Sequence, residues 1–235
     1  MTEIVFRDLS GMAEFRAAEA LQRSVWGAGD QPDPADLMMV VQGLGGLVGG
    51  AFAGDVMMGY IFGLPSRDPT VQHSHRLAVL PEARGLGLGV KLKFYQRDWC
   101  LARSISTVQW TYDPLRPINA ALNIHRLGAQ SGRYLVDYYG EMEGINRGIA
   151  SDRLLVDWAL DTPLVAARAS GDVDLSVEGE VLPLALPRDL DALLAQDIAA
   201  ASGLRMQLRQ ALQKRMAQGQ RIVGFDKQSR CYRLG

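Results

Sequence analysis

The sequence has few cysteines, almost no net charge and no long uninterrupted apolar run. Its two cysteines, Cys100 and Cys231, form neither a CxxC pair nor a set of ligands with metal-site spacing. We therefore expect two reduced thiols and no metal. With 25 basic and 26 acidic residues the formal charge is −1, so no overall basic field attracts phosphate backbones, and nucleic acid is not an expected partner.

No segment has the composition of a membrane span or a secretion signal. The most apolar window, residues 37–63, contains eight glycines together with Gln42 and Asp55, whereas a span needs about 20 mostly apolar residues in succession. The first residues, Met-Thr-Glu-Ile-Val-Phe-Arg, contain neither a basic nor an apolar region and are typical of a first strand. We expect a cytoplasmic protein without a membrane partner.

The chain does contain enough apolar material for a folded core. Hydrophobic residues make up 48% and charged residues 22%, which is close to the average for globular proteins and excludes a disordered chain. The character of the sequence changes after Asp161-Thr162-Pro163. We predict one domain over residues 1–161 and a C-terminal extension over residues 162–235.

Hydrophobic periodicity predicts alternating strands and helices over the first 160 or so residues. The expected order is β-α-α-β-β-β-α-β-α-β-β, an α/β fold with a central mixed sheet flanked by helices. Asp33 is a candidate N-cap because Pro34 follows it at the first helical position. Strands are expected at 4–9, 46–53, 56–64, 71–80, 105–112, 134–139 and 154–160, and helices at 12–26, 34–42, 88–103 and 119–127.

The extension is expected to be a small α+β segment. Short apolar and acidic pieces at 173–177 and 181–184 precede a predicted helix from about 189 to 218, in which Gly203 is a candidate break, and strand pieces are predicted at 222–225 and 231–234. The basic residues of this helix are interpreted as its solvent-facing side; they are Arg205, Arg209, Lys214 and Arg215. Asp152 and Arg153 are interpreted as an ion pair where a strand begins, with the orientation of a polar substrate as the alternative, and the glycine-containing loop 144–148 as a cover for a cleft.

Residues 84–89, Arg-Gly-Leu-Gly-Leu-Gly, follow a predicted strand and open a predicted helix. Unpaired amides and the helix dipole at such a point attract a diphosphate, and glycine lets the backbone approach it closely. A Walker loop would need Gly-Lys-Ser/Thr, but Gly89 precedes Val-Lys-Leu. A dinucleotide fingerprint needs a different glycine step after a first strand. A merely flexible glycine loop is the remaining alternative.

This segment resembles the motif of the GCN5-related N-acetyltransferase (GNAT) superfamily. The pattern Gln/Arg-x-x-Gly-x-Gly/Ala is matched by Arg84, Gly87 and Gly89, after Arg-Leu-Ala-Val-Leu-Pro-Glu at 76–82. The predicted element order over about residues 3–160 is similar to that family's order. The resemblance implies a divergent acetyltransferase, whose C-terminal extension packs on the domain or on a second subunit of a homodimer. Such an enzyme moves an acetyl group from acetyl-CoA to a primary amine of a small molecule or peptide by direct attack, without an acyl-enzyme.

The resemblance also implies where coenzyme A binds. The pantetheine arm would enter a V-shaped opening between the strands at 71–80 and 105–112, and the backbone would bond to it as to an added strand. The asparagines of the following helix, Asn119 and one turn later Asn123, would contact the arm. The backbone positions for the arm are Leu77, Ala78 and Val79, and those for the pyrophosphate are Arg84, Gly85, Leu86, Gly87, Leu88, Gly89 and Val90.

Two histidines on the motif strand are candidates for the general base. Histidine titrates near neutral pH and can accept a proton from an attacking amine. His73 and His75 are two residues apart, so both should point to one face of the strand together with Leu77. The resembled family often has a glutamate base on this strand, and we expect His75 to replace it. Half-buried sheet histidines and a His-x-His metal pair are the alternatives, with His125 as the remaining histidine.

The general acid of the resembled family has no counterpart at its usual place. That tyrosine lies on a helix four residues before a Gly-Phe, where this chain has Ile124 before Gly128-Ala129. Either water protonates the departing thiolate, or Tyr138 or its neighbour Tyr139 on the sixth predicted strand does. A non-catalytic acyl-CoA-binding or sensor module is therefore an alternative function. An acyltransferase that uses a longer acyl-CoA is another, because the glycine-rich hairpin leaves room.

Overall fold

A computed structural model describes residues 3–27, 29–140, 148–171 and 178–235. The chain forms two compact units, residues 1–109 and residues 110–235. The apolar and acidic piece at 173–177 and most of the predicted loop at 144–148 lie outside the described residues.

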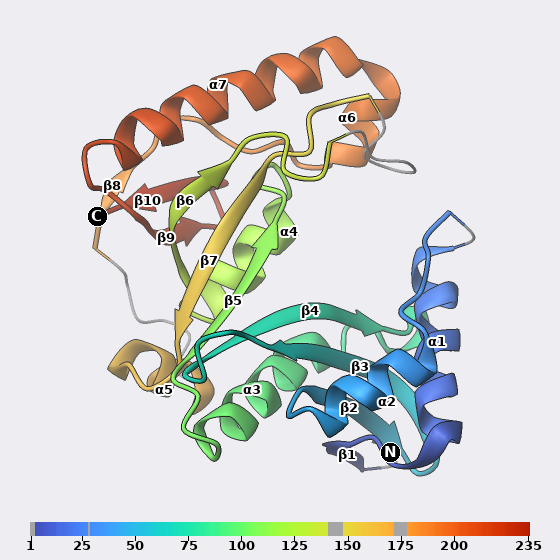
Figure 1. Ribbon diagram of the computed structural model, residues 1–235. Coiled ribbons are helices and arrows are strands. Elements are labelled where there is room, and N and C mark those ends of the chain that lie inside the picture. The colour runs from blue at the N-terminus through green and yellow to red at the C-terminus, as the bar shows by residue number, and fades with distance from the viewer. Residues whose placement is uncertain (1–2, 28, 141–147, 172–177) are drawn as a thin grey trace. The chain divides into compact units, whose positions relative to one another are not determined.

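In the first unit the sheet has the strand order β1-β2-β3-β4-β5 (Figure 1). Neighbouring strands are antiparallel except for β4 and β5, which are parallel. The bounds are β1 Ile4–Asp8, α1 Gly11–Trp26, α2 Ala35–Gly43, β2 Leu47–Ala53, β3 Val56–Pro65, β4 Val71–Val79, η1 Pro81–Ala83, α3 Leu88–Leu101 and β5 Thr107–Tyr112, whose last three residues belong to the second unit. The predicted order of elements is confirmed.

The sheet separates two layers of helices, and β2 shows this because its side chains alternate between the two faces of the sheet. Val48 belongs to a buried cluster with Phe15 of α1 and Met38 of α2. At the next position, a Cβ built on Gly49 would lie 2.6 Å from the ring of Tyr95 on α3. Helices α1 and α2 therefore cover one face and α3 the other (Figure 1), and glycine leaves room for the tyrosine ring.

Polar side chains are buried between β4 and α3. The side-chain nitrogen of Lys93, a residue that is 3% exposed, donates to Oγ of Ser74 and Oε1 of Gln96 at 2.9 Å each. Nε2 of Gln96 in turn donates to Oε1 of Gln72 at 2.6 Å. Burial lowers the pKa of Lys93 to about 7. The first unit therefore contains a lysine whose positive charge is costly to keep in the core.

We expect the stability of the protein to depend on the charge of Lys93. The unfolded chain keeps this proton up to about pH 10.5, whereas the folded chain releases it near pH 7, so stability should rise with pH in that window. Relative to Lys93→Met, the wild-type free energy of unfolding should increase by about 2 kcal/mol between pH 7 and pH 9. Urea unfolding at both pH values measures this increase. Lys91 is exposed on the same helix, so Lys91→Met should show the same rise in the free energy of unfolding between pH 7 and pH 9 as the wild type. A rise in Lys93→Met equal to that of the wild type would contradict the prediction.

In the second unit the strand order is β5-β7-β6-β9-β10-β8, and β9 of the extension pairs with β6 at Ser131 and Ile222. Helix α7 packs against β6, and the π-helical segment η2 packs against β9 (Figure 1). The bounds are α4 Pro117–Ala120, η2 Ala121–Arg126, β6 Gln130–Leu135, β7 Arg153–Ala159, α5 Pro163–Ala169, β8 Glu180–Val181, α6 Leu190–Gln196, α7 Ile198–Met216, β9 Ile222–Asp226 and β10 Cys231–Leu234.

Two predicted elements of the second unit are wrong in their limits. The sixth strand ends at Leu135, so Tyr138 and Tyr139 lie in the turn that follows it and not on the strand. The long helix of the extension breaks at Asp197 and not at Gly203. The carboxylate of Asp197 accepts from the amide of Ala200 at 2.8 Å, which caps the start of α7.

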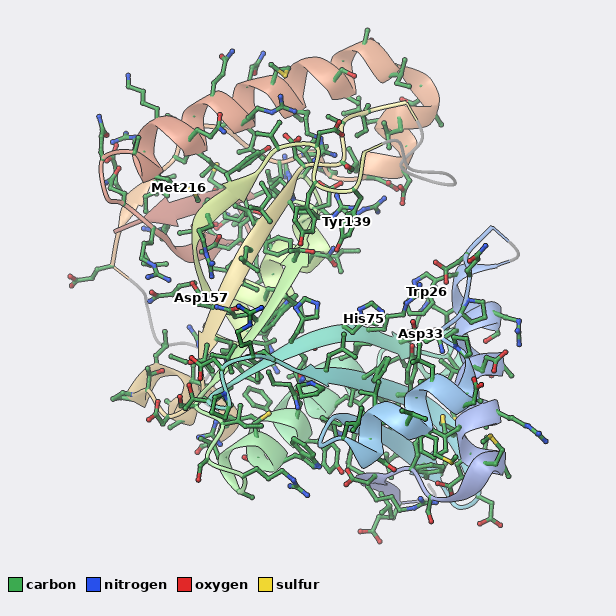
Figure 2. All side chains as sticks on the ribbon, viewed as in Figure 1. Trp26, Asp33, His75, Tyr139, Asp157 and Met216 are labelled. Atoms are coloured by element: carbon green, nitrogen blue, oxygen red, sulfur yellow. The ribbon has the colours of Figure 1, made fainter. Side chains whose placement is uncertain are left out.

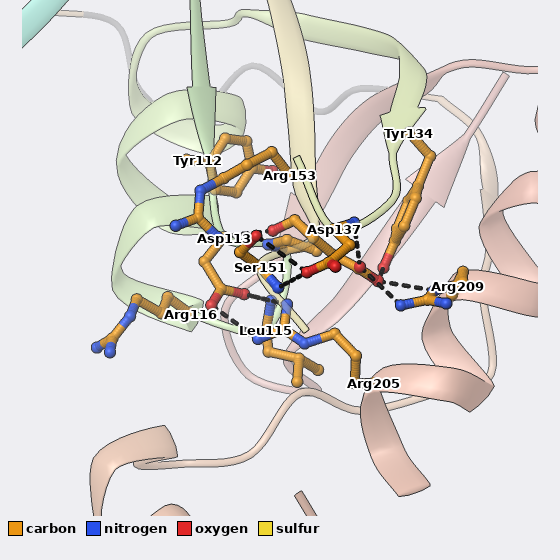
Figure 3. Close-up of polar contacts among 12 residues, drawn as sticks. Tyr112, Asp113, Leu115, Arg116, Tyr134, Asp137, Ser151, Arg153, Arg205 and Arg209 are labelled. Atoms are coloured by element: carbon orange, nitrogen blue, oxygen red, sulfur yellow. Dashed lines mark hydrogen bonds and ion pairs between the residues drawn. The ribbon is translucent and has the colours of Figure 1, made fainter. Parts of the chain in front are cut away.

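The predicted solvent-facing basic side of α7 is also wrong for two of its residues. Arg205, which is 2% exposed, binds both oxygens of Asp113 at 2.8 Å. Arg209 binds both oxygens of Asp152 at 2.9 and 2.7 Å (Figure 3). Asp152 thus pairs with Arg209, while Arg153 donates to the backbone oxygen of Asp152. The aspartates lie 92 and 57 residues from their arginines, beyond the reach of helix periodicity.

The buried pair between Arg205 and Asp113 should be essential for stability. Arg205→Met leaves an uncompensated carboxylate in the core, which we expect to lower the free energy of unfolding by about 3–5 kcal/mol. Denaturation by urea measures the loss. Arg215→Met, which breaks the exposed pair with Glu180, is the matched control on the same helix and should cost less than about 1 kcal/mol. Equal losses in both variants would refute this prediction.

Two further findings concern the whole described chain. Among the helices of the described residues, none is long and apolar enough to cross a membrane. The predicted boundary after residue 161 stays a prediction, because the two compact units divide the chain within β5 and do not address it.

Candidate functional site

The predicted pyrophosphate turn joins β4 to α3. After the short 3-10 helix η1, Gly85 has a φ of 86° and Gly87 a φ of 69°. Both values lie in the left-handed region that favours glycine, and a Cβ at either position would meet nothing within 4 Å. Glycine is therefore required here by the backbone conformation and not by crowding.

This turn presents a set of backbone donors. The amides of Arg84 and Leu86 donate within the turn, to the oxygens of Pro81 at 3.2 Å and Ala83 at 3.4 Å. Helix α3 has no side-chain cap at its first residue, so its dipole and first amides face outward. In the described segment from Gly85 to Val90, five amides make no backbone hydrogen bond; they belong to Gly85, Gly87, Leu88, Gly89 and Val90.

The second predicted part of the cofactor site is the edge of β4. Leu77, Ala78 and Val79 pair with β3 on one side. On the other side, the pairing of β4 with β5 covers only Val71–His73. In the described part of the first unit, the rest of this edge is unpaired and can bond to an added strand. The family resemblance implies that the pantetheine arm binds in this way.

Strand β4 contains a β-bulge at His75. In the register with β3, Phe62 pairs with Arg76 while the next residue, Gly63, pairs with Ser74. His75 is therefore an extra residue, and the bulge turns the side chains of His75 and Arg76 toward the same face of the sheet.

The bulge corrects one prediction about this strand. Beyond it, Ala78 lies in the buried cluster that contains residues of α1 and α2. Leu77 lies on the α3 side, where a Cβ built on Gly89 would be 3.6 Å from its Cδ2. The expectation that Leu77 shares a face with His75 is wrong, because the extra residue shifts the alternation by one position.

The two histidines lie next to each other. Their ring centroids are 6.2 Å apart, and the ring of His75 meets that of Phe62 edge-on at 5.6 Å. Burial, and then repulsion by His75 and Lys93, lowers the pKa of His73. His73 is thus uncharged at neutral pH, and the side chain of His75 is 36% exposed.

A carboxylate that the sequence analysis assigned to a helix cap lies beside His75. Oδ1 of Asp33, in the linker between α1 and α2, is 3.2 Å from Nε2 of His75 (Figure 2). Arg76 binds the same linker through Asp30 and through Oδ2 of Asp33 at 3.3 Å. The N-cap position of α2 is Pro34 and makes no side-chain cap bond. The Asp-Pro pattern was the only sequence signal for Asp33, and it predicted a helix cap, whereas the side chain pairs with His75 far along the chain.

The other predicted site residues lie in the second unit. Asn119 is half-buried on α4, Asn123 is buried in η2, and Gly128 has the expected left-handed conformation with a φ of 73°. Tyr138 and Tyr139 are exposed, and their ring centroids are 4.8 Å apart. The roles of these residues toward acyl-CoA stay predictions.

Neither a metal cluster nor an activated thiol stands out. No group of three or more His, Cys, Asp or Glu side chains that could hold a metal occurs among the described residues. Cys100 and Cys231 are free and buried. Burial raises the pKa of Cys100 to about 12, so this thiol is not a ready nucleophile.

No protein-family model matches the sequence, and no curated protein sequence matches it either. Solved structures do match the fold. The Sinorhizobium meliloti GNAT-superfamily phosphinothricin acetyltransferase, in complex with acetyl-CoA, is 21% identical with a TM-score of 0.52, and the match covers 67% of this chain and 88% of that one. The chain has the fold of the GCN5-related N-acetyltransferases.

Two further acetyltransferase structures support the GNAT fold. The Escherichia coli ribosomal-protein-S18-alanine N-acetyltransferase matches with a TM-score of 0.56 at 16% identity, over 68% of this chain and 96% of that one. A putative acetyltransferase from Salmonella typhimurium with its cofactor acetyl-CoA matches with a TM-score of 0.55 at 19% identity, over 68% and 95% of the two chains. About a third of the present chain lies outside each match.

Proposed function

We propose that this protein is an acyl-CoA-dependent N-acyltransferase, which moves an acetyl group from acetyl-CoA to a primary amine. One observation carries the proposal: a left-handed glycine turn leaves five amides free at the start of α3, beside the open edge of β4. The five amides fit a pyrophosphate, and the open strand edge fits an extended arm that contains amide groups. The GNAT fold supports the same assignment.

The donor set supports a proposal for the residues that would hold coenzyme A. The amides of Gly85 and of residues 87–90 would bind the pyrophosphate, since those of Arg84 and Leu86 already donate within the turn. The backbone of residues 77–79 would hold the pantetheine arm. Bound acyl-CoA supplies the acyl group as an activated thioester.

The side chains of the site would then manage protons. His75, with the uncharged His73 beside it, would accept the proton that the acceptor amine loses as its nitrogen attacks the acyl carbon. The new C–N bond replaces the C–S bond, and Tyr138 or water would return a proton to the departing thiolate. Because Cys100 is buried with a raised pKa, we propose direct transfer without an acyl-enzyme.

The acceptor is proposed as a small-molecule amine or a peptide, in the cytoplasm and without a nucleic-acid or membrane partner. A homodimer, a longer acyl donor and a non-catalytic sensor stay open as predictions, and the experiments below separate the last of these from an enzyme.

Coenzyme A binding should depend on the conformation of Gly87. An alanine with a φ of 69° is strained by about 1–2 kcal/mol, so Gly87→Ala should distort the turn and weaken coenzyme A binding roughly tenfold or more. Calorimetry with coenzyme A and acetyl-CoA measures this. Gly219→Ala is the matched control, because Gly219 also has a left-handed φ, 85°, and open space around it. Unchanged affinity in Gly87→Ala would argue against a pyrophosphate at this turn.

Catalysis should depend on His75. His75→Ala should lower turnover about a hundredfold or more while coenzyme A still binds, because only proton transfer is lost. Thiol release with acetyl-CoA and a panel of amino acids, polyamines and peptides measures turnover. His125→Gln in the second unit serves as the control. If the wild-type protein binds coenzyme A but acylates none of these amines, the sensor alternative is favoured.

A further inference from the structure

We propose that Asp33 is the positioning residue of His75: it fixes this histidine as the Nε2–H tautomer, so that Nδ1 is the nitrogen that accepts the proton. The inference rests on the proposed function, in which His75 is the base. It adds a residue from the α1–α2 linker and identifies the reacting nitrogen.

The hydrogen-bond chemistry of the pair selects the tautomer. Nε2 of His75 lies 3.2 Å from Oδ1 of Asp33. An ionised carboxylate can only accept, so the imidazole must donate through Nε2. A neutral imidazole has one N–H, which leaves the lone pair on Nδ1. In the described part of the chain Nδ1 has no hydrogen-bond partner, and the side chain is 36% exposed, so this nitrogen remains available to a substrate.

Asp33 is itself held in place from two sides. The backbone amide of Asp33 donates to Oε1 of Gln22 at 2.9 Å, and Nε2 of Gln22 donates to the backbone carbonyl oxygen of Asp33 at 3.3 Å. Gln22 lies on α1 and is fully buried. Nε of Arg76 lies 3.3 Å from Oδ2 of Asp33. The carboxylate therefore needs no rearrangement to hold the ring, as a positioning group requires.

Because of Arg76, the tautomer of His75 should depend on whether residue 33 is an aspartate or an asparagine. A guanidinium has donors only, so in Asp33→Asn it would bind the amide oxygen. The amide nitrogen would then face His75 and donate to Nε2, which would have to accept. The ring proton would move to Nδ1, and the nitrogen proposed as the base would lose its lone pair. An almost isosteric substitution should thus reverse the tautomer.

Nitrogen-15 NMR of the histidine side chains tests the proposal directly. Long-range proton–nitrogen spectra of the neutral rings distinguish the two tautomers, and the sequence has only three histidines. We expect Nε2–H for His75 in the wild-type protein and Nδ1–H in Asp33→Asn. Asp30→Asn is the matched control, because Asp30 binds Arg76 from the same linker but does not pair with His75. It should keep the wild-type tautomer.

Kinetics supply a second readout that a purely structural role would not produce. Asp33→Asn should lower kcat about a hundredfold or more, whereas the KM for acetyl-CoA should stay within about twofold, because the residue does not touch the cofactor-binding backbone. Asp30→Asn should keep kcat within about threefold of wild type.

Several results would overturn the proposal. A wild-type His75 with its proton on Nδ1 would do so without any variant, which keeps the test decisive even if Asp33→Asn does not fold. An unchanged tautomer in folded Asp33→Asn, or equal losses of kcat in the Asp33 and Asp30 variants, would also do so. If the wild-type protein acylates no amine, the proposed function fails, and the NMR result still decides whether Asp33 sets the tautomer.

Discussion

The pairing of β4 with β3 positions every proposed group of the first unit, and it contains one extra residue. The bulge at His75 allows two consecutive side chains, His75 and Arg76, to face the linker between α1 and α2. Beyond the bulge, the strand leads into the glycine turn with Leu77 on the α3 side. One local irregularity thus separates the face proposed for proton transfer from the end proposed for phosphate binding.

Charged groups are buried in both units, and each unit stabilises them differently. In the second unit, Arg205 and Arg209 of α7 meet aspartates at the end of β5 and before β7 through paired hydrogen bonds (Figure 3). These bonds tie the C-terminal part of the chain to strands far away in sequence. In the first unit, the amino group of Lys93 is bonded to neutral side chains and has a lowered pKa. The arginine–aspartate pairs of the second unit favour the charged state of their groups, whereas the surroundings of Lys93 in the first unit disfavour its charged state.

Local signals in the sequence were sufficient for the order of elements and for the glycine turn. Gly85 and Gly87 could be identified because a left-handed turn before a helix restricts the residue type. The face of Leu77 could not be predicted, since a bulge depends on the partner strand and leaves the apolar pattern of its own strand nearly unchanged. Asp33 was missed for a related reason: an acid before proline has a plausible local role as a helix cap, while its observed partner is 42 residues away.

The linker that holds His75 also has a charge of its own. Asp30 and Asp33 contribute two negative charges and Arg76 one positive charge, so the three side chains sum to −1. Under the proposed function, the acceptor amine is an ammonium ion in solution, which this local field attracts, and it releases one proton to water before the neutral amine attacks. It leaves as a neutral amide, which the field does not attract. The carboxylate of Asp33 that orients the base would therefore also favour the binding of substrate over product and so limit product inhibition.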